Sequence, residues 1–123
     1  MKRTIFAIAI IIVIVGIVAS GTHYVKQAND VMTDYLAKIE TVAKQDNPKQ
    51  ALMLCEEAEK EWVNFEKKLN LFVNHAEICE IGVGISAMKP LIEHNEKAEF
   101  FSQLNEVKVM LTHLASMENI NSK

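Results

Sequence analysis

The hydrophobic positions of this chain follow two patterns that meet near residue 21. Residues 5–21, IFAIAIIIVIVGIVASG, contain no charged residue and show no polar face. Beyond them, apolar residues recur in alternating steps of three and four, the spacing of one face of a helix. The chain is therefore predicted to be all-α, with an apolar N-terminal helix followed by amphipathic helices.

The apolar run is long enough to be a membrane anchor. Its seventeen residues span about 25 Å at 1.5 Å per residue, and a membrane-spanning helix needs about 17–25 residues. Lys2 and Arg3 precede it, which predicts a cytoplasmic N-terminus in a single-pass protein of the cell membrane. His23 and Tyr24 are then expected at the outer interface, where amphipathic rings are favoured.

A cleaved signal peptide is the alternative interpretation of the same run. Ala19, Ser20 and Gly21 supply the small residues that a cleavage site needs. However, the run exceeds the usual apolar length of about 7–15 residues in a signal peptide. We therefore divide the chain into an anchor or signal peptide, residues 1–21, and an extracytoplasmic helical domain, residues 22–123.

The rest of the chain is predicted to form four helices. Their apolar stripes are Val25, Ala28, Met32, Tyr35, Ile39 and Val42; Cys55, Ala58, Trp62, Phe65, Leu69 and Phe72; Ile78, Ile81, Ile85, Met88 and Ile92; and Phe100, Leu104, Val107, Leu111 and Leu114, with fraying from Met117 to Lys123. Short turns make successive helices antiparallel neighbours. This predicts an up-down bundle of four helices, or three helices on a stalk continuous with the span.

Several polar, glycine and proline residues suggest where these helices begin and end. Asp46 or Asn47 is a candidate N-cap with Pro48 at the first helical position. The segment Asn74-His75-Ala76 interrupts the pattern, and His75 is expected to cap or bridge that turn through backbone hydrogen bonds. Pro90 is predicted to kink or end the third helix, and Asn95 to cap the fourth. Gly82 and Gly84 are expected to let a neighbouring helix approach closely.

These features resemble domain-of-unknown-function family 4363, small bacterial proteins with one N-terminal span and a helical remainder. The most specific part is the segment from Trp62 to Ile78; the other residues of the resemblance are Ile81, Ile85, Phe100, Leu104, Leu111, Asn119 and Ile120. The resemblance implies an extracytoplasmic helical domain with a membrane protein as partner. It implies no assigned activity and no catalytic residues.

Charge limits the partners of the predicted exported domain. Without Lys2 and Arg3, eleven basic residues face sixteen acidic ones, a net charge of −5. An acidic surface disfavours nucleic acid and anionic headgroups. The bilayer, through residues 5–21, and another membrane protein or a second copy are the partners we expect.

The cysteines and histidines offer the only candidate chemistry. No disulfide is expected between Cys55 and Cys79, because Cys55 lies about 30 Å from the turn beside Cys79. His23, His75 and His113 fall toward the membrane end with Cys79, yet none has the spacing of a metal motif. We therefore expect no catalytic residue, no metal site and no cofactor.

The sequence favours a non-enzymatic interaction or accessory module for another membrane protein. The alternative is a ligand-sensing extracytoplasmic bundle that holds a small molecule between helices near Gly82 and Gly84. A third hypothesis, an enzyme or metal carrier, would use His75, Cys79 and His113.

Overall fold

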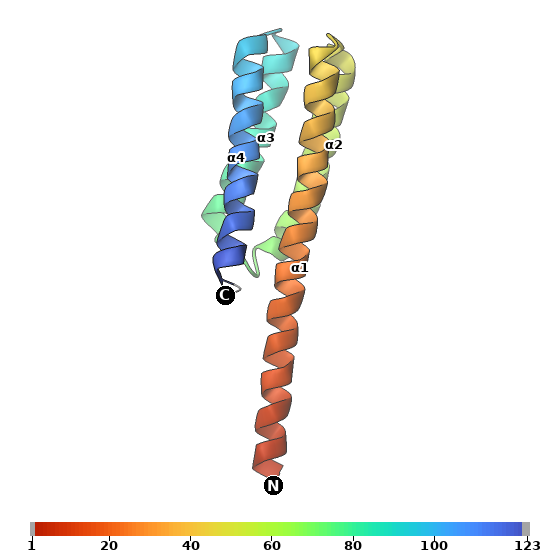
Figure 1. Ribbon diagram of the computed structural model, residues 1–123. Helices are drawn as coiled ribbons and strands as arrows, with labels where there is room; N and C mark the ends of the chain where they lie inside the picture. The colour runs from red at the N-terminus through yellow and green to blue at the C-terminus, as the bar shows by residue number, and fades with distance from the viewer. Residues whose placement is uncertain (1, 122–123) are drawn as a thin grey trace.

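The computed structural model describes the backbone of residues 2–121 and the side chains of residues 2–17 and 19–116. Four helices account for most of it: α1 (Lys2–Lys44), α2 (Pro48–Leu69), α3 (His75–Glu93) and α4 (Lys97–Asn121) (Figure 1). The described residues contain no strand, and the predicted all-α class is confirmed. Helix α4 continues through Asn121, so the fraying expected from Met117 does not occur up to that residue, and residues 122–123 lie outside the described part.

Each helix packs against two others in a ring. The contacts join α1 to α2, α2 to α3, α3 to α4, and α4 back to α1. Only the second half of α1 takes part, because the first half projects alone from one end (Figure 1). We call residues 2–20 the shaft and residues 21–116 the body. Residues 21–44 pack against α2 and α4, so they belong to the body.

The core is built from the predicted stripes of all four helices. Trp62 is 1% exposed and is the largest buried side chain. In α1, Leu36 is fully buried, while the predicted Tyr35 is only partly buried. The stripe from Ala28 through Met32 to Leu36 advances four residues at each step, as a helix of 3.6 residues per turn allows.

The predicted stripe of α2 runs past the end of its helix, and of the two effects predicted for Pro90, a kink or a helix end, the helix end does not occur. Helix α2 ends at Leu69, so Phe72 lies in the turn that follows and not on the helical stripe. Helix α3 does not end at Pro90 but continues to Glu93. Proline removes only one backbone donor, and here the lost bond falls in the last turn, where Met88 is buried and Ile92 packs against the core.

The two turns at the far end of the body close in the same way. Asp46 and Asn95 both have φ 57°, the left-handed conformation that follows many helices. The next residue donates its N–H to a carbonyl five positions back; the two bonds are Asn47 to Val42 and Glu96 to Leu91. Asn95 therefore ends α3 and does not cap α4, which corrects the prediction. Asn47 is the predicted N-cap of α2, and its side chain accepts a bond from the Gln50 N–H.

Side-chain hydrogen bonds to backbone carbonyls set the register between helices. The Trp62 indole N–H donates to the Ile78 carbonyl at 3.2 Å, and the Gln103 amide donates to the Gly84 carbonyl at 3.1 Å. A Cβ on Gly82 would lie 3.3 Å from the Trp62 ring, and one on Gly84 would lie 2.9 Å from the Met110 methyl group. The predicted close approach at both glycines is confirmed.

Candidate functional site

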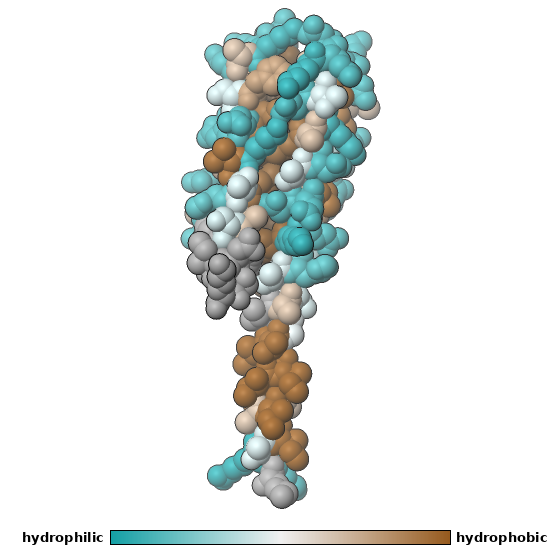
Figure 2. Space-filling view, in the orientation of Figure 1, coloured by the Kyte–Doolittle hydropathy of each residue, from teal (hydrophilic) through white to brown (hydrophobic). Residues whose placement is uncertain are grey.

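The shaft is apolar around its whole circumference. Its large side chains from Ile5 to Ile17 are 46–70% exposed, and they form the brown column below the body in Figure 2. Soluble proteins rarely expose a continuous apolar surface of this kind. At 1.5 Å per residue, residues 2–20 extend about 28 Å, close to the 30 Å of a bilayer core. One helix among the described residues, α1, is long and apolar enough to cross a membrane.

A cluster of residues from α1, α2 and the α2–α3 turn lies where the shaft enters the body. The Phe72 ring covers Gly21, and a Cβ placed there would lie 2.4 Å from a ring carbon. Tyr24 packs edge-to-face on Phe65, with ring centroids 5.7 Å apart. The Lys68 ammonium lies 5.6 Å from the centre of the Tyr24 ring. We call these five residues the collar. It brings the α2–α3 turn against α1 where the apolar run ends.

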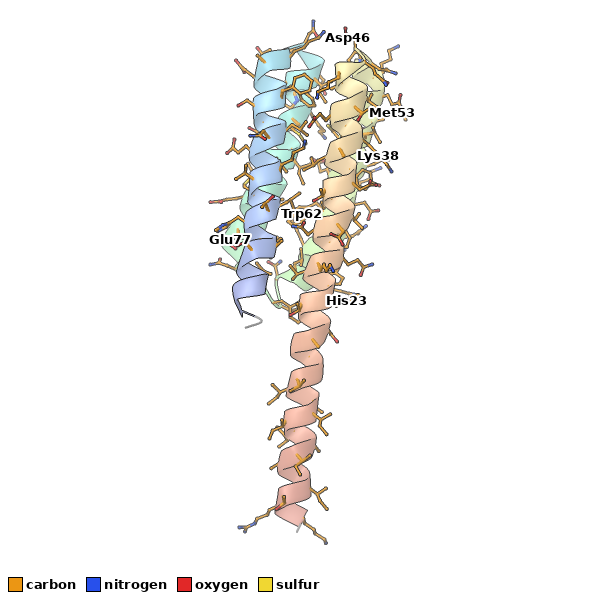
Figure 3. The ribbon with its side chains drawn as sticks, viewed as in Figure 1. His23, Lys38, Asp46, Met53, Trp62 and Glu77 are labelled. Atoms are coloured by element: carbon orange, nitrogen blue, oxygen red, sulfur yellow. The ribbon has the colours of Figure 1, made fainter. Side chains whose placement is uncertain are left out.

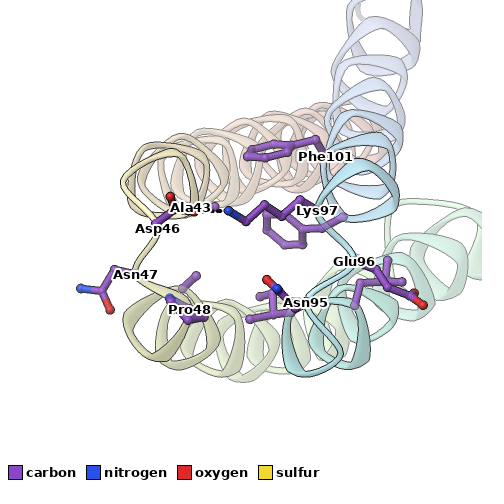
Figure 4. A pocket seen from close by; sticks show the side chains of 12 residues that line it. Ala43, Asp46, Asn47, Pro48, Asn95, Glu96, Lys97 and Phe101 are labelled. Atoms are coloured by element: carbon purple, nitrogen blue, oxygen red, sulfur yellow. Dashed lines mark hydrogen bonds and ion pairs between the residues drawn. The ribbon is translucent and has the colours of Figure 1, made fainter.

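A cavity of about 220 Å³ opens at the opposite end, between the two turns that close in the same way. Its walls are mainly apolar, and Asp46 and Lys97 form an ion pair beside it (Figure 4). The residues that line it are Ala43, Asp46, Asn47, Pro48, Ala51, Leu91, Ile92, Asn95, Glu96, Lys97, Phe100 and Phe101. Apolar cavities of about 150 Å³ are large enough for benzene. The arrangement suits a small apolar molecule with a polar group at the ion pair.

The two glycines singled out in the sequence do not enclose a cavity together. Gly82 lines an open groove between α2 and α3, bordered by the exposed side chains of Val63 and Val83. Gly84 is buried on the other side, against Val107 and Met110 of α4. The hollow expected near both glycines is therefore a surface groove beside Gly82 alone.

Besides Asp46–Lys97, two ion pairs among the described residues join the first helical hairpin, α1–α2, to the second, α3–α4. Glu40 of α1 pairs with Lys108 of α4, and Glu59 of α2 accepts bonds from Ser86 at 2.6 Å and Lys89 at 3.3 Å. The hydrogen bond from Lys108 holds the pKa of Glu40 below its usual value, and that from Ser86 does the same for Glu59. Both carboxylates lie on α1–α2, and both lysines lie on α3–α4. These pairs therefore favour the packing of α1–α2 against α3–α4, and they could not form between two copies of α1–α2.

Two of the histidines have other side chains as partners. His75 bonds to the Asn70 side chain at 2.9 Å, and so bridges the α2–α3 turn through a side chain and not through the backbone groups we expected. His113 lies 3.8 Å from Glu77, and His23 lies at the base of the body (Figure 3). Throughout the described residues, no group of three or more His, Cys, Asp or Glu side chains could hold a metal ion.

Both cysteines are free thiols with different surroundings. Cys55 is buried on the core stripe of α2, and this burial raises its pKa to about 12. Cys79 is exposed and lines the α2–α3 groove. Because the thiolate is the reactive form, Cys55 is inert and Cys79 is the accessible thiol.

Sequence reasoning missed the collar and the far cavity. Both are made by residues distant in the sequence, such as Gly21 with Phe72 and Asp46 with Lys97. Each site still left a local signal: Leu71-Phe72-Val73 is an apolar triplet in a turn, and Phe100-Phe101 is an aromatic pair in the first turns of a helix. These signals do not identify which distant segment of the same chain each one contacts.

Taken together, the helices and the shaft define a small helical protein with one candidate membrane span. The chain belongs to the family described as Domain of unknown function (DUF4363), whose profile matches residues 19–123. The match covers the body and leaves out most of the shaft. No curated protein and no solved structure matches the chain.

Proposed function

We propose that the chain is a single-pass protein of the cell membrane. Residues 5–21 cross the bilayer, Lys2 and Arg3 stay on the cytoplasmic side, and residues 22–123 form an extracytoplasmic up-down bundle of four helices. The carrying observation is that α1 runs unbroken from the exposed apolar shaft into the core of the body. A continuous helix holds the body at a fixed height above the bilayer.

Fractionation and protease accessibility test the anchor and its direction. A tag after Lys123 should stay with the membrane fraction at full length and be removed by protease added to intact protoplasts. Release of a product that lacks residues 1–21 would show that the apolar run is a signal peptide. A full-length protein whose tag is protected from protease would contradict the proposed orientation.

We propose further that the body is a non-enzymatic accessory module that binds another membrane protein or a second copy. Support comes from the α2–α3 groove, where Val63 and Val83 expose apolar surface beside Cys79. A photo-crosslinking residue at position 83 should capture a discrete adduct in intact cells. The same residue at Met53, which is 60% exposed and lines none of the hollows described above, is the matched control. Equal capture at both positions, or none at position 83, would refute this binding face.

The far cavity supports the alternative, a ligand-sensing bundle. It combines apolar walls with an ion pair, as small-molecule sites do. Phe101→Trp should obstruct the cavity, since Phe101 lines it and is only partly buried. If the cavity binds ligand, small aromatic acids should raise the unfolding temperature of the native chain and leave that of Phe101→Trp unchanged. Equal shifts in both proteins would exclude this cavity as the site.

A further inference from the structure

The α2–α3 turn exposes apolar side chains at the end of the body that faces the shaft. Leu71 is 77% exposed and Phe72 is 37% exposed, whereas turns in water favour polar residues, Gly and Pro. The turn lies beside α1 at the base of the body (Figure 1). An exposed leucine at this position calls for a surface that it can contact.

The collar fixes the height of this turn relative to the proposed span. Phe72 packs on Gly21, the last residue of the apolar run. If residues 5–21 cross the bilayer, Phe72 therefore lies at the level where the chain leaves the hydrocarbon. Leu71 precedes Phe72 in the same turn and is placed at the membrane surface by the same contact.

The residues around the turn are those expected at a membrane interface. Tyr24 has an aromatic ring with a polar end, as residues of the interfacial belt do. Lys67 and Lys68 occupy the last turn of α2, and two residues separate Lys68 from Leu71. Lysine side chains at this height can extend toward lipid phosphates while their methylene groups cover apolar surface.

We propose that residues 71–73 form a second membrane contact, with Leu71 inserted into the interface of the leaflet next to the body. This inference rests on the proposed span. The bilayer is the favoured occupant because a lipid surface surrounds a span on all sides at the height that Gly21 sets. With two membrane contacts, the shaft and the turn, both the tilt of the body relative to the bilayer and its rotation about the axis of the shaft are fixed.

Spin labels on the full-length chain in phosphatidylcholine vesicles test this contact. The label is attached at Leu71→Cys in a Cys79→Ser background, where the buried Cys55 stays unlabelled. Ile12→Cys in the shaft and Met53→Cys on the body are matched controls, being 66% and 60% exposed. We expect position 71 to resemble position 12, with frequent collisions with dissolved oxygen and few with a water-soluble nickel chelate. Position 53 should show the reverse.

Three results would overturn the proposal, and they have different meanings. In the first, the nickel chelate reaches position 71 as easily as position 53, while position 12 lies in lipid. This result would leave the proposed span intact and exclude the second membrane contact. Position 71 shielded from both reagents shows that a protein, either a second copy or a partner, covers the turn. A nickel-accessible position 12 refutes the span and the inference together.

Discussion

The two halves of α1 share one backbone and differ in what covers them. In the shaft, the described apolar side chains are exposed in every direction, and no other helix lies beside them (Figure 1). In the body, one stripe of the same helix is fully buried while most of the intervening positions are polar. Length and helix content alone would not separate the two halves.

The comparison shows that the spacing of apolar residues along a helix indicates whether that helix packs against protein or lies in an apolar medium. A stripe one third of the way around a helix matches a neighbouring protein surface, whereas an uninterrupted apolar surface needs a medium without water. The boundary falls at Gly21, the first residue of α1 that is buried among those whose burial the structure describes. Substitutions matched across this boundary should therefore give different results.

The largest expected difference is between a buried and a shaft side chain truncated to alanine. Met32→Ala removes a fully buried side chain and should lower the free energy of unfolding by about 2–5 kcal/mol. Ile12→Ala should change it by less than about 0.5 kcal/mol in detergent. Denaturant titrations followed by Trp62, the single buried tryptophan, measure both. Comparable losses would show that the shaft packs against the body.

A charged residue placed in the shaft tests whether the shaft lies in the hydrocarbon of a bilayer. Ile12→Arg puts a cation near the middle of the proposed span, where it costs about 2.5–3.5 kcal/mol. We expect the variant to be extracted from membranes by alkaline carbonate. Asp34→Arg, on an exposed position of the body half, should remain integrated. A membrane-integrated Ile12→Arg would argue against a span centred at this residue.

Glycine-to-alanine changes sharpen the position of the boundary. At Gly16 a Cβ would have no atom within 4 Å, so alanine should be tolerated and should raise helix propensity by up to about 1 kcal/mol. At Gly21 the Cβ would collide with the Phe72 ring, and we expect a loss of about 1–2 kcal/mol. The Trp62 denaturation midpoint should fall only for Gly21→Ala. The same midpoint in both variants would mean that the collar does not stabilise the body.

Much of the fold could be predicted because its determinants are local. The four stripes follow from spacing along single helices, and Trp62, Met88 and Leu111 lie in the core as their spacing indicates. Asn47 and Pro48 form a start signal that acts within one turn of helix. The unbroken apolar run likewise needs no tertiary information.

Some wrong predictions depended on contacts between distant residues, and one depended on where the preceding helix ends. Phe72 continues the stripe of α2, but its ring is held by Gly21, about fifty residues earlier in the chain. Asn95 suits both an N-cap and a left-handed helix end, and the choice depends on α3 continuing past Pro90. The chain has sixteen acidic residues, and spacing does not indicate which of them form ion pairs between the hairpins, as Glu40 does with Lys108 and Glu59 with Lys89.

The smallest effect we predict concerns pH, and it falls only on the body half of the comparison. The hydrogen bond from Lys108 lowers the pKa of Glu40, and that from Ser86 lowers the pKa of Glu59. A lowered pKa stabilises the folded state above the unfolded value, about 4.3 for glutamate. This contribution is lost as the pH falls through the folded pKa. Because both carboxylates are about one-third exposed, each pair should contribute only about 0.2–1 kcal/mol.

The variants Glu40→Gln and Glu59→Gln test this assignment. Each should be less stable than the native chain at pH 7 and nearly equal to it at pH 3, measured by denaturant titration of Trp62 fluorescence. Asp34→Asn is the matched control, because the Asp34–Lys38 pair lies within one exposed helix face and joins no second helix. A stability difference that persists unchanged at pH 3 would mean that the glutamates act through packing and not through charge. Residues 5–21 carry no titratable side chain, so membrane integration of the shaft should be the same at both pH values.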